Sequence, residues 1–222
     1  MDASSVLRQL AISAPAILVA ITFHEVAHGY IAWRLGDSTA KAMGRLTLNP
    51  IAHIDPVGTV LMPALLLIFT NGQFVFGYAK PVPINPYNFK NPRKDMAISA
   101  AGGPVANILL AVASLLIIRL VVVPLSGILP EQAGATVLRP LYMMLQYSIV
   151  INVVLAVFNM IPVPPLDGGR VLVGLLPQRQ AYALSKVEPF GMLIVILLIV
   201  TGIARIFLNP LIELFLALLR AF

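Results

Sequence analysis

The amino-acid sequence predicts an all-α polytopic membrane protein with about four transmembrane helices. Of its 222 residues, 59% are hydrophobic and only 11% are charged, and the mean hydropathy is +0.92. These values lie outside the range of soluble globular domains and inside that of integral membrane proteins. Several apolar segments are also long enough to cross a hydrocarbon core, which takes about 20 residues. No repeat or appended domain is visible, so we expect residues 1–222 to form a single integral-membrane domain.

Charged or proline-containing stretches separate the segments that we expect to span the bilayer. These segments are Gln9–Trp33, Met96–Ile118, Pro140–Leu166 and Pro189–Leu208. In the third segment the helix is predicted to end near Met160, because the prolines that follow cannot continue it. Asn209-Pro210 is predicted to break the chain before Leu211–Leu219, which is too short to span alone.

A further apolar run, Val57–Thr70, is predicted to re-enter the membrane or to lie flat on it, because it is short and contains Gly58 and Pro63. The basic residues support this reading. Residues 34–94 carry seven Lys or Arg and residues 162–188 carry three, whereas residues 120–138 carry none. The positive-inside rule then places the N-terminus outside and both basic loops in the cytoplasm. The basic residues form no patch, so we expect no nucleic-acid partner.

A short β-like extended segment is predicted between the first two spans. Residues Gln73–Ile84 read QFVFGYAKPVPI, in which aromatic and β-branched residues are followed by alternating prolines. This composition favours an extended segment or an edge strand over a helix.

The first span carries an HExxH motif, HEVAH, at residues 24–28. On a helix, residues four apart share a face, so His24 and His28 can offer two imidazoles to one metal ion. Glu25 lies next to them and can act as a general base toward water that the metal activates. The flanking residues are uncharged back to Arg8 and on to Arg34. Ionisable groups at membrane depth mark function, so the motif indicates proteolysis within the bilayer.

Asp167 is the strongest candidate for a third metal ligand. The chain has no cysteine, so the ligands must come from His, Asp or Glu. Asp167 follows the helix of the third span, whose direction is parallel to the first span if one crossing lies between them. Gly168 and Gly169 allow positive φ and a close backbone approach around the metal. An ordinary Asp-Gly turn is the alternative reading.

These motifs together resemble the site-two protease family of intramembrane zinc metalloproteases. They are HEVAH on an early span, AGGPVAN at residues 101–107 on a middle span, and NMIPVPPLDGGR at residues 159–170 after a later one. The resemblance implies one Zn²⁺ per chain, bound by His24, His28 and Asp167, with Glu25 as general base. It also implies that Asn159 helps to hold the substrate carbonyl. The chain resembles a minimal member without the PDZ insertion or CBS tail of other members.

Two polar residues, Asn107 and His53, can each be assigned two different roles. Asn107 is either an amide that joins two helices or a second donor to the oxyanion. His53 is either bonded to its own loop or a resting-state ligand over the open metal position.

The function expected from these residues is an intramembrane zinc endopeptidase of a bacterial or archaeal cell membrane. It would cut single-span membrane proteins in or near their transmembrane segments, with its active site toward the cytoplasm. We expect the edge Phe74–Ile84 to receive the unwound substrate as an added strand. The alternatives are a divalent-metal transporter, which normally has several ligand clusters along its path, and an inactive protease-like membrane chaperone.

Overall fold

The computed structural model describes residues 3–69 and 77–221. Within these ranges the chain is mostly helical and contains no strand, which confirms the predicted all-α membrane fold. Three helical stretches are long and apolar enough to cross a membrane: Gln9–Arg34, Pro92–Ser126 and Glu131–Asn159. A fourth candidate is a bent pair, α9 (Gln178–Ser185) with α10 (Glu188–Val200), in which the two helices meet at 69°.

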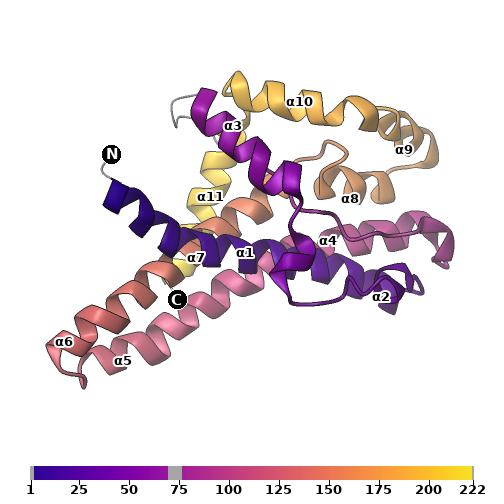
Figure 1. The fold of residues 1–222 in the computed structure, drawn as a ribbon. Coiled ribbons are helices and arrows are strands. Elements are labelled where there is room, and N and C mark those ends of the chain that lie inside the picture. Colours follow the sequence, from indigo (N-terminus) through magenta and orange to yellow (C-terminus); the bar gives the residue numbers. More distant parts are fainter. Residues whose placement is uncertain (1–2, 70–76, 222) are drawn as a thin grey trace.

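Helix α4 (Pro92–Ile117) lies at the centre of the bundle. It packs against α1 (Ala3–Arg34), α7 (Arg139–Asn159) and α8 (Asp167–Leu175). Small buried residues along α1 and α4 allow these helices to approach closely; they include Ala16, Ala20, Ala100, Gly102, Gly103 and Ala111. Figure 1 shows α4 and α7 as the arms of a long antiparallel hairpin that turns at α5 (Val123–Ser126) and α6 (Glu131–Ala133).

This order makes α1 and α7 parallel, as expected, because the antiparallel helix α4 lies between them in the chain. The HExxH residues near the C-terminal end of α1 and Asp167 after the C-terminal end of α7 therefore reach the same level. Two π-helical stretches continue the arms of the hairpin, Ile118–Val122 after α4 and Gly134–Leu138 before α7.

The predicted fourth span is interrupted at a different place from the one expected. Helix α10 ends at Val200, and Gly202 adopts φ +77°, a conformation that glycine tolerates and other residues rarely adopt. Helix α11 (Ile203–Ala221) then runs straight through Pro210, so the predicted break at Asn209-Pro210 is wrong. Apolar side chains of α11 pack on a core formed by α4 and α7, and this packing outweighs the cost of about 3 kcal/mol for an internal proline.

The apolar run expected to re-enter or lie flat forms two short pieces, a π-helical turn at Pro56–Leu61 and α3 (Met62–Phe69). It is not among the candidate spans of the described residues. The segment predicted as β-like, called the extended segment below, forms neither helix nor strand from residue 77 to residue 85, and its first residues, 73–76, lie outside the described part.

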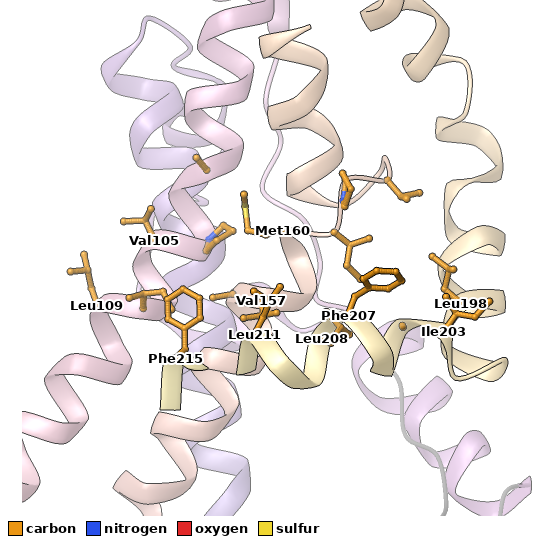
Figure 2. Close-up of a pocket in the computed structure, with 18 residues that line it drawn as sticks. Val105, Leu109, Val157, Met160, Leu198, Ile203, Phe207, Leu208, Leu211 and Phe215 are labelled. Atoms are coloured by element: carbon orange, nitrogen blue, oxygen red, sulfur yellow. The ribbon is translucent and has the colours of Figure 1, made fainter. Parts of the chain in front are cut away.

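A cavity of about 850 Å³ lies between α4, the C-terminal end of α7 and the first half of α11. Figure 2 shows Val105 and Leu109 of α4 on one side of this cavity and Phe207 and Leu211 of α11 on another, with Met160 between them. The lining is apolar throughout. Helix α11 therefore packs on α4 and α7 along part of its length and borders this cavity along another part.

Candidate metal centre

Helix α1 brings His24 and His28 together as the HExxH spacing predicts. Both side chains are buried, with 8% and 7% of their surface exposed. Their Nε2 atoms lie 3.0 Å apart, and the rings meet edge to face.

Asp167, the first residue of α8, completes the group. Its Oδ2 lies 3.2 Å from Nε2 of His24 and 3.3 Å from Nε2 of His28. Two glycines let α8 begin so close to the turn before it: a Cβ on Gly168 would lie 2.2 Å from the carbonyl oxygen of Met160, and one on Gly169 would lie 2.1 Å from the nitrogen of Pro164. Both glycines are helical and not in the positive-φ region, so close approach is the reason for them.

Hydrogen bonding assigns the proton on each imidazole. Nδ1 of His28 lies 2.8 Å from the carbonyl oxygen of Ser99, which can only accept, so Nδ1 donates. Nδ1 of His24 lies 2.6 Å from Oδ1 of Asn107, which also accepts. Both Nε2 atoms, as assigned from these partners, therefore present lone pairs to each other and to Asp167.

The centre thus gathers acceptor atoms with no proton between them. Oδ2 of Asp167 is buried and has no hydrogen-bond partner. Such an arrangement is repulsive unless a cation lies among the atoms. Two imidazole nitrogens with one carboxylate oxygen are typical ligands of a catalytic zinc. His24, His28 and Asp167 can therefore hold a Zn²⁺ ion.

Gly103 of α4 lies directly against the two histidine rings. A Cβ placed there would lie 2.4 Å from Nε2 of His28 and 2.5 Å from Cε1 of His24. The imidazoles themselves therefore occupy the space that a side chain at position 103 would fill.

Glu25 is half-buried and faces the extended segment. Its Oε2 accepts a hydrogen bond of 2.8 Å from the backbone N–H of Val82. Backbone N–H groups of this kind orient a carboxylate without neutralising it.

Asp37, which the sequence analysis did not single out, ties the extended segment to the end of α1. It is fully buried and accepts hydrogen bonds from the backbone and hydroxyl of Thr39, the backbone of Asn85 and the side chain of Asn88. Burial raises the pKa of Asp37, but these hydrogen bonds lower it further than burial raises it. An Asp followed two residues later by Thr, just after a helix, is a turn signal that could have indicated part of this role.

The remaining candidate residues lie outside the ligand group. Asn107 contacts His24 and uses both amide hydrogens, toward the carbonyl oxygen of Ala20 and Oδ1 of Asn152. Asn159 ends α7, and its amide donates to the carbonyl oxygen of Leu155. His53 is buried, and its Nε2 donates to the carbonyl oxygen of Thr47. Within the described residues His53 does not join the metal group.

Comparisons with known proteins agree with this geometry. Residues 120–202 match the family described as Peptidase family M50. The chain is 37% identical over 197 residues to YwhC of Bacillus subtilis, named as a zinc metalloprotease, covering 89% of this chain and 84% of that protein. It is 29% identical over 184 residues to Rip2 of Mycolicibacterium smegmatis, also named as a zinc metalloprotease, covering 83% of this chain and 64% of that protein.

Rip2 of Mycobacterium tuberculosis is likewise 29% identical, over 181 residues. No solved structure matches the chain significantly. The comparisons confirm the predicted family, the enzyme class and zinc as the cofactor. The chain therefore belongs to peptidase family M50, the site-two protease family, and is a membrane-embedded zinc metallopeptidase.

Proposed function

We propose that this enzyme is an intramembrane endopeptidase that cuts single-span membrane proteins in or near their transmembrane segments. The observation that carries the proposal is the burial of the His24–His28–Asp167 group among spanning helices. His28 lies six residues before the end of α1, which is roughly 9 Å at about 1.5 Å per residue. A peptide bond that reaches this group must come from a segment inside the membrane or just emerging from it.

His24, His28 and Asp167 are proposed as the zinc ligands and Glu25 as the general base. Bound zinc would supply a Lewis acid for the substrate carbonyl and lower the pKa of a water molecule toward about 7. Glu25 takes the proton of that water at its carboxylate and later returns it to the leaving amine. The N–H of Val82 holds Oε2 of Glu25, which leaves Oε1 as the proton acceptor.

Asn159 is the proposed side-chain partner of the developing oxyanion. Its contact with Leu155 uses one of the two amide hydrogens, and the side chain is half-buried. Asn107 suits this role less, because both of its hydrogens already have acceptors.

The backbone of the extended segment supports the idea that it receives the substrate as an added strand. The N–H groups of Tyr78, Lys80 and Val82 point into the protein, toward the carbonyl oxygens of Gly58 and His53 and the carboxylate of Glu25. The carbonyl groups of Tyr78 and Lys80 point the same way, accepting from Thr59 and Arg45. In an extended chain the residues between them face the opposite side.

That opposite side, formed by residues 79, 81 and 83, is the proline edge, and at Pro81 and Pro83 it can offer carbonyl acceptors but no N–H. A substrate strand paired here donates its own N–H groups to the edge. The substrate carbonyl groups that face Pro81 and Pro83 find no N–H donor there. The edge also borders a cavity of about 600 Å³, lined in addition by Pro164 and Arg170, through which an unwound segment can pass.

The proposed orientation has the active site toward the cytoplasm. The extended segment and α8 both belong to the basic loops, 34–94 and 162–188, whereas residues 120–138 carry no Lys or Arg. The proposed setting is a bacterial or archaeal cell membrane. A metal transporter would need several ligand clusters along its path, and the described residues contain one.

The test of the proposed function compares wild type with Glu25→Gln on a synthetic single-span substrate in detergent or liposomes. The amide keeps the volume and can still accept from Val82 but cannot take a proton. We expect cleavage to fall by about 10²-fold or more while zinc content stays stoichiometric. Glu213→Gln is the matched control, because Glu213 is an exposed carboxylate on α11. This variant should retain full activity. Substantial cleavage by Glu25→Gln would exclude Glu25 as the base.

A proline scan of the substrate tests the proposed strand pairing. A substrate proline lacks the N–H that the carbonyls of Pro81 and Pro83 would accept. We expect cleavage to be lost at alternate positions near the cut site, with a period of two residues. A loss without this alternation would contradict pairing along the proline edge.

A further inference from the structure

A line of buried amides connects the metal centre to the interior of the bundle. It runs from Nδ1 of His24 to Oδ1 of Asn107 at 2.6 Å, from Nδ2 of Asn107 to Oδ1 of Asn152 at 2.8 Å, and from Nδ2 of Asn152 to the carbonyl oxygen of Ser148 at 2.8 Å. Asn107 and Asn152 are both completely buried. The line crosses from α1 through α4 to α7, the three helices that bring the ligands together.

Each bond in this line fixes the direction of the next one. Nδ2 of Asn152 donates to a backbone carbonyl, so its Oδ1 must face Asn107. Nδ2 of Asn107 donates to this oxygen and also to the carbonyl oxygen of Ala20 at 3.1 Å. Its Oδ1 is then left for His24, and this acceptor keeps the proton of His24 on Nδ1 and the lone pair on Nε2.

From this geometry we propose that Asn152 is a positioning residue of the metal centre, although it touches none of the ligands. It fixes the amide of Asn107, and Asn107 fixes the tautomer and ring orientation of His24. The inference rests on the proposed role of His24 as a zinc ligand. Partners of metal-bound histidines typically change metal affinity about 10–100-fold when they are removed.

Removing the acceptor at position 152 leaves one hydrogen of Asn107 without a partner in a completely buried site. Only the longer bond of 3.1 Å to the carbonyl oxygen of Ala20 then still orients the Asn107 amide, and in the fraction of molecules with a rotated amide Nδ2 would face Nδ1–H of His24. We expect Asn152→Leu to weaken zinc binding by about tenfold or more.

The experiment measures zinc affinity of the purified full-length chain by competition with a chromophoric chelator, and the visible spectrum of the Co²⁺-substituted protein. Ser114→Ala is the matched control. Ser114 is buried on the same α4–α7 interface and bonds to the hydroxyl of Ser148. Its loss leaves the shorter bond from Asn152 to the carbonyl oxygen of Ser148 in place. The control should change zinc affinity by less than about twofold, well below the effect of removing a hydrogen-bond partner of a metal-bound histidine. It should also leave the cobalt spectrum unchanged.

An Asn152→Leu protein that folds and keeps wild-type zinc affinity and cobalt spectrum would overturn the proposal. If that variant does not fold, a cycle of Asn107→Ser, Asn152→Ser and the double variant decides. Action through Asn107 predicts a double variant no weaker in zinc binding than Asn107→Ser alone, whereas additive losses contradict it. These readouts are independent of cleavage: a wild type that binds zinc but cuts nothing refutes the proposed function alone, and undiminished zinc affinity in His24→Ala refutes the ligand assignment.

Discussion

Gly103→Ala is the substitution that tests the metal centre most directly, because it adds one methyl group against both histidines. The new Cβ would lie 2.4 Å from Nε2 of His28 and 2.6 Å from Nε2 of His24. Comfortable contacts between such atoms are about 3.5–4.0 Å. The two rings must therefore move by roughly 1 Å, since α4 is held by α1, α7 and α8 around it.

The fold should tolerate this change better than the metal does. Overpacking a tight interior costs about 1–3 kcal/mol, and alanine returns about 1 kcal/mol of helix propensity relative to glycine. Metal ligation tolerates only about 0.2 Å of error in ligand distance. We expect the Gly103→Ala protein to fold but to bind zinc at least about 100-fold more weakly, a difference of roughly 2.7 kcal/mol.

The assay is chelator competition for zinc on the purified protein, with thermal unfolding measured in parallel. Gly102→Ala is the control one residue away. Its Cβ would lie 2.5 Å from Cδ1 of Ile31, the mobile end of a side chain, and 3.3 Å from the carbonyl oxygen of Ala27. The control should keep wild-type zinc affinity. Wild-type affinity in Gly103→Ala would refute the claim that the imidazoles need the space above this glycine.

Other substitutions probe the ligand set, the anchor of the extended segment and the topology. Asp167→Ala should lose zinc, because two remaining ligands hold it poorly; stoichiometric zinc by elemental analysis would remove Asp167 from the ligand set. Asp37→Asn puts a donor against the N–H of Asn85 and should destabilise the protein by about 1–3 kcal/mol at pH 7. Because the folded pKa of Asp37 is lowered, this difference in thermal stability should shrink as pH falls below about 3.9, the ordinary pKa of Asp; a difference independent of pH would contradict the carboxylate's role. In this cysteine-free chain, a Cys at Gly127 should react with an impermeant thiol reagent from outside and a Cys at Asn91 should not; the reverse labelling would invert the topology.

The metal group could be predicted from sequence because each of its parts depends on a simple rule. Helical periodicity brings His24 and His28 to one face, and the direction of successive spans brings Asp167 to their level. Composition alone identified the three long spans. These features depend on the helical period, the length of the apolar segments and the number of membrane crossings between them. None of them requires knowledge of how the helices are rotated about their axes.

The features that the sequence did not reveal depend on that rotation or on packing between distant segments. Pro210 looked like a break, but the apolar contacts of α11 carry the helix through it, and the chain bends at Gly202 instead. The bond between Glu25 and Val82 joins residues 57 positions apart. The amide line through Asn152 likewise requires three helices to be set at particular angles, which the sequence does not show.

The proline edge also has a consequence for inhibitor chemistry. A peptide mimic built for this enzyme would gain little from carbonyl groups placed opposite Pro81 and Pro83, because neither proline can donate to them. Donors at alternate positions would be the useful groups, and N-methylation there should abolish binding. Potency in such a series should therefore follow the spacing of N–H groups more than the identity of the side chains.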